Sequence, residues 1–332
     1  PPINRLSQKI KITAKTQRRE KIVKAAIIGA GPAGLSCGWF LRNAGFEVDI
    51  FEQKNLAGGM VSAAIPSFRL TNEAIERDIR RILASGVHLH DNYLIDRTQF
   101  AVLLRDNDAI FLAAGAQQSV RLEIEGVESK GVIDPLEFLF DVRLNSEPAT
   151  GRHVVIVGGG NTAMDAARTA YRIVGNEGSV TIVYRRTIKE MPADHGEIEA
   201  VKKEGIRIIE LTNPVSILSS NGRVTALLCS RNMLAMKGTD GRPAPVTIPG
   251  SEFEIPCDTI IPAIGQQLAI DFAGTDQLKT IPGSYKTRIP GLYMGGDALR
   301  GASTAINAIA DGRKAAAEII AETQFLNPTF AG

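Results

Sequence analysis

The sequence predicts an α/β protein made of two similar units, and three observations support this fold class. An apolar, strand-like run ends in the spacing G-x-G-x-x-G over Ala25–Gly34, and a helical pattern follows at once. The same device returns as G-x-G-x-x-A over Val154–Ala163. Each unit also contains an apolar strand that ends in small residues, Asp108–Ala116 in the first and Cys257–Gly265 in the second. Strands that alternate with helices in this way favour parallel sheets covered by helices.

Length and composition narrow the class of protein further. The 332 residues are enough for about two domains, and 44% hydrophobic with 22% charged residues is typical of a globular protein. A net charge of +2 gives no reason to expect a nucleic acid or an acidic membrane as partner, and the sequence has no apolar run of about 20 residues that could span a bilayer. Cys37, Cys229 and Cys257 are far apart and fit no metal or iron–sulfur ligand pattern, so we expect no metal site and a reducing, cytoplasmic setting. The oligomeric state is left open.

The first glycine turn has the residues that the pyrophosphate of a dinucleotide requires. Gly29 permits a tight turn, Gly31 lets the backbone approach the pyrophosphate, and Gly34 lets helix and strand pack closely. Pro32 and Ala33 open the helix, whose N-terminus supplies free N–H groups and partial positive charge to the phosphates. We therefore expect a dinucleotide on this turn.

Further positions of the first unit fit the same ligand. Glu52 ends the second apolar run at the expected distance of about 20 residues, where a carboxylate accepts hydrogen bonds from a ribose. Gly59 belongs to a glycine pair that allows close backbone approach to a ligand. Arg69 follows this glycine pair in the sequence and can contact the same ligand, or alternatively it forms a salt bridge on a helix predicted over Asn72–Leu83. The small side chains of Ala114–Gly115 would let a cofactor lie on the backbone.

The second unit differs from the first at the position that selects between nucleotides. The strand Ser179–Tyr184 aligns with Glu47–Glu52, but it ends in Tyr184 and is followed by Arg185 and Arg186. A carboxylate there would repel the 2′-phosphate of NADP, whereas guanidinium groups pair with it. We therefore expect NADP rather than NAD at this site. The alternative is a pair of arginines on a solvated strand end.

The chain then returns through Gly291–Asp297 to a predicted helix that starts near Ser303 and reaches Ile320. Asp297 follows a glycine pair at a strand end, where its carboxylate can hold a ribityl hydroxyl near a pyrophosphate; the alternative is an ordinary helix cap. The start of the Ser303 helix would direct N–H groups and its dipole at a ligand there.

The motifs together resemble one family. GAGPAG with Glu52, LAGGM, IPSFRL, DAIFLAAGA, GGGNTAMD, YRR and PGLYMGGD are similar to the flavoprotein module of the NADPH-dependent glutamate synthase small subunit. The same module occurs in dihydropyrimidine dehydrogenase and in proteins of the selenate-reductase type. The resemblance covers roughly residues 22–325. It implies two Rossmann-like, three-layer dinucleotide-binding domains in a glutathione-reductase-like arrangement, with the NADPH domain inserted into the FAD domain.

This resemblance sets the expected domains and binding residues. The domains are an N-terminal arm or linker (1–24), which could alternatively dock a partner, the FAD domain (25–118 and 266–325), the NADPH domain (119–265) and a tail (326–332). For FAD we expect Gly29, Gly31, Pro32, Ala33, Gly34, Glu52, Gly59, Arg69, Ala114, Gly115, Gly296, Asp297, Ser303, Thr304 and Ala305. For NADPH we expect Gly158, Gly160, Asn161, Thr162, Ala163, Arg185, Arg186 and Gly265.

The implied activity is hydride transfer from NADPH to FAD, followed by electron transfer to an iron–sulfur centre on another domain or subunit. The cofactors carry this chemistry, so we assign no catalytic acid or base. The family usually has a cysteine-rich iron–sulfur domain in front of this module, and this sequence does not contain it, so we expect the clusters on another chain or on a longer parent polypeptide. The alternatives are a stand-alone reductase of a small molecule or quinone and a non-catalytic FAD-binding scaffold.

Overall fold

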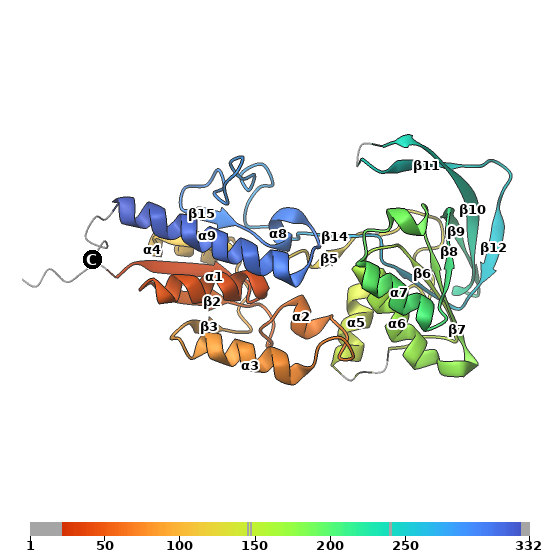
Figure 1. Ribbon diagram of the computed structural model, residues 1–332, viewed down its shortest axis with the longest axis horizontal. Coiled ribbons are helices and arrows are strands. Elements are labelled where there is room, and N and C mark those ends of the chain that lie inside the picture. Colours follow the sequence, from red (N-terminus) through yellow and green to blue (C-terminus); the bar gives the residue numbers. More distant parts are fainter. Residues whose placement is uncertain (1–21, 145, 147, 239–240, 327–332) are drawn as a thin grey trace, which may run out of the picture.

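Two parallel sheets organise the chain in the computed structural model, which describes residues 22–144, 146, 148–238 and 241–326. Figure 1 shows the sheets apart along the long axis, with red, orange and blue elements around one and green and cyan elements around the other. Each sheet contains one of the two glycine turns. The predicted arm lies outside the described residues up to residue 21, and the predicted tail lies outside them from residue 327.

The first sheet is entirely parallel and has the strand order β15-β4-β1-β2-β3. Ile28 of the central strand lies beside Phe51 of β2 and Leu112 of β4, so these strands end at one edge of the sheet. The strand β15 comes from the far end of the sequence, and the last part of the chain therefore completes the first unit. The strands are β1 (Lys24–Ile28), β2 (Glu47–Phe51), β3 (His88–His90), β4 (Ala109–Leu112) and β15 (Leu292–Met294).

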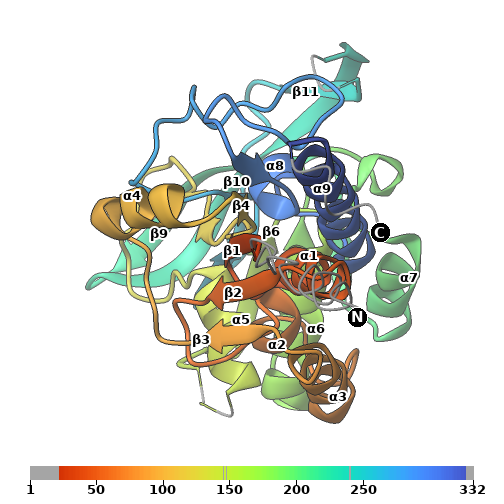
Figure 2. The same cartoon turned by 90° about the vertical axis from the view of Figure 1, so that its left-hand side faces the viewer.

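Helices cover both faces of the first sheet. Ala25 and Ile27 of β1 pack with α1 and α9 in one apolar cluster, whereas Ala26 and Ile28 pack with α4 in another, because successive side chains of a strand point to opposite faces. Figure 2 shows α1 and α9 side by side, with α4 across the sheet from them. The helices are α1 (Pro32–Asn43), α2 (Met60–Ala63), α3 (Asn72–Leu83), α4 (Arg97–Asp106), α8 (Asp297–Arg300) and α9 (Ala305–Leu326).

The second sheet is also parallel and has the strand order β13-β6-β7-β8. Its helices pack with Ile156 and Ile182 in an apolar cluster on one face. The strands are β6 (His153–Val157), β7 (Ser179–Val183), β8 (Arg207–Ile209) and β13 (Thr259–Pro262). The helices of this unit are α5 (Pro135–Arg143), α6 (Asn161–Val174) and α7 (His195–Lys203), with the 3-10 turns η1 (Gly175–Glu177) and η2 (Ile188–Glu190).

An antiparallel sheet covers the other face of the second sheet. Val155 and Val183 pack against Ile217, Leu227 and Cys229 of this antiparallel sheet. Its strands are β9 (Thr212–Ser220), β10 (Arg223–Lys237), β11 (Pro243–Thr247) and β12 (Phe253–Pro256), and β10 pairs with the other three. The outer layer on this side is thus a sheet, and the β10–β11 hairpin projects from it (Figure 1).

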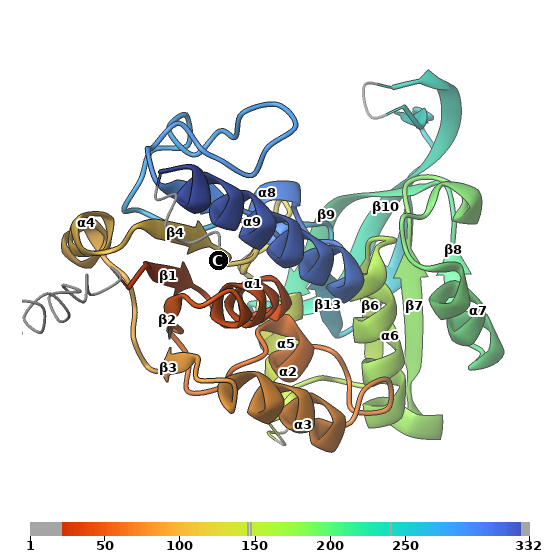
Figure 3. The same ribbon diagram turned by 60° about the vertical axis from the view of Figure 1, so that its left-hand side comes forward.

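The two units are joined where the chain crosses between them twice. The crossings are the short strands β5 (Gln118–Ser119) and β14 (Gln266–Gln267), which pair in antiparallel fashion. In chain order the second unit is inserted between β4 and β15 of the first, and Figure 3 shows the two units next to each other. The crossings lie next to the predicted boundaries at residues 118/119 and 265/266, and division of the chain at those residues stays a proposal.

The helix α9 has 22 residues and lies along α1. Ser36 Oγ donates a hydrogen bond to the Ile309 carbonyl at 2.9 Å and ties the two helices together. No helix in the described ranges has the combination of length and apolar composition needed to cross a membrane.

Candidate dinucleotide-binding site

Three cavities follow one another from the first unit into the second. The outer cavity is about 110 Å³ and the central cavity is about 340 Å³, and both are lined by Gly29, Glu52, Ala114, Gly115 and Gln117. The inserted-unit cavity is about 540 Å³, and it shares Asn161, Thr162, Gln266, Ala302 and Ser303 with the central cavity. The three cavities therefore form a continuous path, and the larger two have volumes typical of sites for small molecules.

The glycine turn between β1 and α1 forms one wall of the central cavity. Gly29 has a φ of +104°, and a Cβ there would lie 2.5 Å from the Ala113 carbonyl oxygen. Any other residue at position 29 would therefore strain the turn and clash with the backbone of Ala113, directly after β4. No side chain caps the N-terminus of α1, which follows Gly31. Its first N–H groups are thus available to an anion such as a pyrophosphate.

Glu52 is held rigidly at the border of the outer and central cavities. Its carboxylate is buried and accepts hydrogen bonds from the backbone N–H groups of Ala30, at 2.9 Å, and Lys54, at 3.0 Å. These two bonds fix its orientation beside the glycine turn. A carboxylate so placed can accept from the hydroxyls of a ribose.

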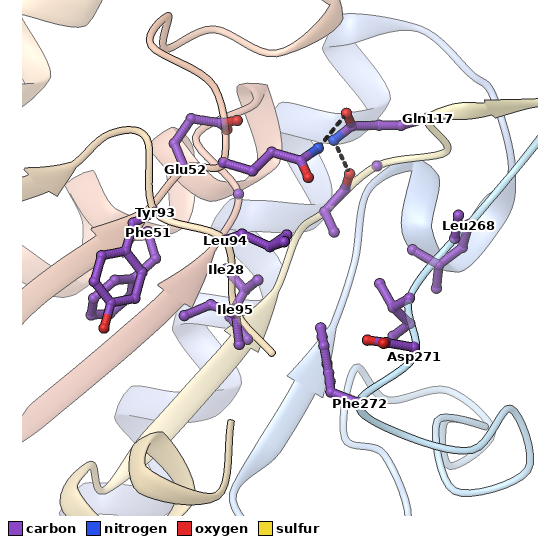
Figure 4. A pocket seen from close by; sticks show the side chains of 16 residues that line it. Ile28, Phe51, Glu52, Tyr93, Leu94, Ile95, Gln117, Leu268, Asp271 and Phe272 are labelled. Atoms are coloured by element: carbon purple, nitrogen blue, oxygen red, sulfur yellow. Dashed lines mark hydrogen bonds between the residues drawn. The ribbon is translucent and has the colours of Figure 1, made fainter. Parts of the chain in front are cut away.

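The outer cavity lies beyond Glu52 and is mainly apolar, as Figure 4 shows. The rings of Phe51 and Tyr93 lie 5.2 Å apart, and Gln53 Nε2 donates to Gln117 Oε1 at 2.8 Å. The arrangement suits a planar, largely apolar group attached to the ribose. Sequence reasoning missed this cavity, because its loops around Tyr93 and Phe272 have no motif and meet only in the fold.

The returning segment forms the opposite wall of the central cavity and carries Asp297. Oδ1 of Asp297 is buried, and no hydrogen-bond partner for it occurs among the described residues. Burial raises the pKa of Asp297, and the backbone N–H of Ser303 lowers it in part. The preceding Gly296 N–H donates to Asp311 at 3.1 Å, which fixes the turn. A buried acceptor without a partner is costly, and a ligand hydroxyl in the cavity would satisfy it.

These observations fit FAD. The open N-terminus of α1, the fixed Glu52 carboxylate and the unpaired Asp297 oxygen match a pyrophosphate, a ribose and a ribityl hydroxyl in turn. The three groups line one continuous pair of cavities. A pyrophosphate would accept from the uncapped N–H groups of α1, and a ribityl hydroxyl would satisfy the buried Asp297 oxygen.

The second glycine turn forms the wall of the inserted-unit cavity. A Cβ added at Gly160 would have no atom within 4 Å, so this position opens onto free space. The helix α6 follows Gly160 directly, and no side chain caps its N-terminus. Thr162 Oγ1 accepts a hydrogen bond from Gln266 Nε2 at 3.0 Å, at the junction with the central cavity. This turn therefore suits a second pyrophosphate.

The two arginines after β7 are placed differently from one another. Arg185 is exposed and lines the inserted-unit cavity. Arg186 lines it too, but its side chain is buried and its Nε donates to the Pro243 carbonyl at 2.7 Å. The alternative of two solvated arginines is therefore wrong for Arg186. The β10–β11 hairpin adds Arg242 to the same wall, a residue that sequence reasoning missed because it lies in a turn-rich segment without a motif.

Arg69 forms an ion pair that sequence reasoning did not anticipate. It lines the central cavity, but its guanidinium contacts Asp165 at 2.7 Å and Glu197 at 2.9 Å, both in the inserted unit. The predicted alternative, a salt bridge on the helix Asn72–Leu83, is therefore wrong about the partner. A direct role of Arg69 in binding FAD stays a prediction.

The predicted binding residues lie around the three cavities with three exceptions, and the role of each in binding stays a prediction. Gly34 packs against β1, where any Cβ would clash with the Gly29 carbonyl. Ala163 is fully buried in the core of the inserted unit. Gly296 faces Asp311 rather than the cavity. These three residues do not line a cavity, and they pack behind the residues that do.

A model of the pyridine nucleotide-disulphide oxidoreductase family matches residues 23–312. The chain belongs to this family. Pyridine nucleotide-disulphide oxidoreductases are enzymes that bind FAD and NAD(P). At the level of the family, this confirms the predicted oxidoreductase activity and the predicted cofactors.

Three curated relatives show where the chain stands in the pyridine nucleotide-disulphide oxidoreductase family. The NADP(+)-dependent formate dehydrogenase subunit beta of Moorella thermoacetica is 39% identical over 310 residues, 89% of this chain and 43% of that subunit. The NADPH-Fe(3+) oxidoreductase subunit beta of Geobacter sulfurreducens is 38% identical over 260 residues, 76% of this chain and 38% of that subunit. The glutamate synthase [NADPH] small chain of Escherichia coli is 32% identical over 318 residues, 88% of this chain and 67% of that one. The predicted resemblance is thus confirmed, and the chain spans less than half the length of the first two relatives.

Solved structures confirm the fold. FprA from Mycobacterium tuberculosis in complex with NADPH has a TM-score of 0.79 at 19% identity, over 93% of this chain and 86% of that one. Thioredoxin reductase from T. acidophilum has a TM-score of 0.67 at 19% identity, over 92% of this chain and 99% of that one. The architecture of two Rossmann-like domains, one inserted into the other, is therefore the one predicted from the sequence.

The three cysteines of this pyridine nucleotide-disulphide oxidoreductase do not line the three cavities. Cys37, Cys229 and Cys257 are all buried and free. Burial raises the pKa of the Cys229 and Cys257 thiols to about 12, and it raises that of Cys37 as well. Since the thiolate is the reactive form, burial of the three thiols disfavours thiol–disulfide exchange at neutral pH.

Proposed function

We propose that this chain is a flavoprotein module that takes electrons from NADPH onto FAD and passes them to an iron–sulfur centre on another domain or subunit. One observation carries the proposal: the central and inserted-unit cavities meet at Thr162, Gln266 and Ser303. A nucleotide bound on each glycine turn would thus extend toward the other at this junction. FAD and NADPH supply the hydride chemistry when they are bound.

The residues at the junction of the two cavities can orient the bound nucleotides, but they are not suited to exchange protons with them. The side chains shared by the two cavities belong to Asn161, Thr162, Gln266, Ala302 and Ser303, and none of them is an acid or base near neutral pH. The N-terminal end of α9 begins at Ala305, directly after Ser303 and Thr304. Its dipole favours negative charge in the central cavity. These features support transfer of electrons between two cofactors that the protein holds in position, without a general acid or base.

The preference for NADPH rests on the arginines of the inserted-unit cavity. Arg185 is exposed on its wall, where a 2′-phosphate can form charge-assisted hydrogen bonds with a guanidinium. The names of the formate dehydrogenase, Fe(3+) oxidoreductase and glutamate synthase relatives also specify NADP(+) or NADPH.

Transfer to another subunit is supported by the form of the relatives. Those from Moorella and Geobacter are named as beta subunits, and the one from Escherichia coli as a small chain. The three cysteines are buried and do not line the cavities, so they are not placed to receive electrons from a flavin there. An external acceptor of single electrons, such as an iron–sulfur protein, fits both facts.

An anaerobic titration tests the proposal. FAD-loaded protein should lose its long-wavelength flavin absorbance when NADPH is added, and an excess of an oxidised iron–sulfur protein added next should restore it. NADH in place of NADPH is the control and should act more slowly. Protein that binds no FAD, or whose FAD is not reduced by NADPH, would contradict the proposal. Direct turnover of a quinone without any iron–sulfur protein would favour a stand-alone reductase.

A further inference from the structure

The turn of the β10–β11 hairpin brings a third arginine to the inserted-unit cavity. Arg242 lies directly before β11 and lines this cavity with Arg185 and Arg186, which follow β7. The two segments are far apart in sequence, and the hairpin belongs to the antiparallel layer rather than to the parallel sheet. The cavity wall is thus built jointly by the Rossmann-like sheet and by the hairpin.

Three hydrogen bonds fasten the hairpin to the loop after β7. Arg186 Nε donates to the Pro243 carbonyl at 2.7 Å, and Arg242 Nη1 donates to the Glu190 carbonyl at 3.3 Å. Asn232 Nδ2, from β10, donates to the Arg185 carbonyl at 3.0 Å. Arg186 and Asn232 are buried. These contacts set the position of Arg242 relative to Arg185, so the arginines face the cavity as a preorganised group.

The charged side chains that line this cavity in the described part of the chain have a single sign. Among the described residues, every charged side chain that lines it is an arginine: Arg185, Arg186 or Arg242. The central cavity differs, because Glu52, Asp165 and Asp297 line it together with cations. Arginines on a cavity wall attract an anion, and planar guanidinium groups match the oxygens of a phosphate.

We propose that Arg242 is a specificity-determining residue that binds the 2′-phosphate of NADP(H) together with Arg185. The inference rests on the proposed function, since it assumes that the inserted-unit cavity holds the nicotinamide nucleotide. It extends that function, because selection of NADP(H) depends on a hairpin outside the strand–turn–helix motif. Arg186 acts as a positioning residue, through its bond to the Pro243 carbonyl.

Calorimetric titration of FAD-loaded protein with NADP+ and with NAD+ tests this role. Arg242→Ala should weaken NADP+ binding by about ten- to a hundredfold, the loss expected for a charge-assisted hydrogen bond, and should leave NAD+ binding unchanged. Arg242→Lys keeps the charge but loses the planar guanidinium group, so its affinity for NADP+ should lie between those of wild type and Arg242→Ala. Arg223→Ala is the matched control, because Arg223 is an exposed arginine at the start of β10 and does not line the cavity.

The outcomes separate this inference from the proposed function. If wild-type protein binds NADP+ more tightly than NAD+ but Arg242→Ala keeps that preference, the role of Arg242 is overturned and the proposed function stands. Equal losses for both nucleotides, or equal losses in Arg242→Ala and Arg223→Ala, overturn it as well. If wild-type protein binds neither nucleotide, the proposed function fails and this inference fails with it.

Discussion

Arg69 Nη1 lies 2.7 Å from Asp165 Oδ1, and this ion pair joins the two Rossmann-like units. Arg69 comes from the loop between α2 and α3, whereas Asp165 lies one turn into α6, close to Thr162 at the cavity junction. The Asp165 side chain is only 8% exposed. Glu197 of α7 binds the same guanidinium at 2.9 Å. The angle between the units is therefore tied to a buried charge beside the site.

Replacement of Arg69 should destabilise the protein strongly. Arg69→Ala would leave the buried Asp165 carboxylate without its main partner, a change that costs about 3–5 kcal/mol. Arg77→Ala is the control, because the Arg77–Asp78 pair is more than 70% exposed on both sides and exposed pairs contribute less than about 1 kcal/mol. Thermal unfolding of both variants at neutral pH is the measurement. Equal changes in the two variants would show that the interdomain pair is unimportant for stability.

The stability of the protein should depend on pH through Asp165. Burial raises the pKa of Asp165 to about 6, against the opposing effect of Arg69. The native state thus binds this proton more tightly than the unfolded chain, where the pKa is about 4. The stabilisation that follows is complete below about pH 4 and is lost as the pH rises through about 6. Asp165→Asn cannot ionise, so its unfolding temperature relative to wild type should increase between pH 4 and pH 7. A constant difference across that range would contradict the assignment.

Asp297 should matter for FAD and not for the fold. Its Oδ1 is buried without a partner among the described residues, so Asp297→Ala removes an unsatisfied acceptor and should leave the stability of the apoprotein unchanged or higher. Its affinity for FAD should fall by about ten- to a hundredfold, which recovery of quenched flavin fluorescence can measure. Asp276→Ala, at an exposed aspartate, should leave FAD binding as it is. Unaltered FAD affinity in Asp297→Ala would rule out the ribityl contact.

The two glycine turns should respond differently to an added methyl group. Gly29→Ala combines a φ of +104° with a Cβ 2.5 Å from the Ala113 carbonyl oxygen, and it should destabilise the fold. Gly160→Ala has open space around its Cβ, so it should fold normally and weaken NADP+ binding, because the methyl group occupies the cavity. Thermal unfolding combined with calorimetric titration separates the effects. Normal NADP+ binding by Gly160→Ala would place the pyrophosphate elsewhere.

Local patterns were sufficient to predict the strand–turn–helix units, because short-range sequence determines them. The predicted helix Asn72–Leu83 has the bounds of α3, and Glu52 lies against the first glycine turn as expected. The outer cavity, the partners of Arg69 and the contribution of Arg242 were not predictable. Each depends on segments far apart in the sequence that meet only after folding, and none of these segments carries a motif. The burial of Arg186 has the same origin, since the hairpin covers it.

The paired strands β5 and β14 have a consequence for how the enzyme works. Both chain crossings run side by side through this ribbon, so the inserted unit is tethered covalently at one place. Because the inserted unit is connected covalently only through this ribbon, its orientation relative to the first unit depends on the other contacts between the two units. The Arg69–Asp165 pair and the Gln266–Thr162 hydrogen bond are two of these contacts. In the proposed function, the distance between the two bound nucleotides would therefore depend on these contacts and on the apolar packing of Met60 and Ala64 against the inserted unit.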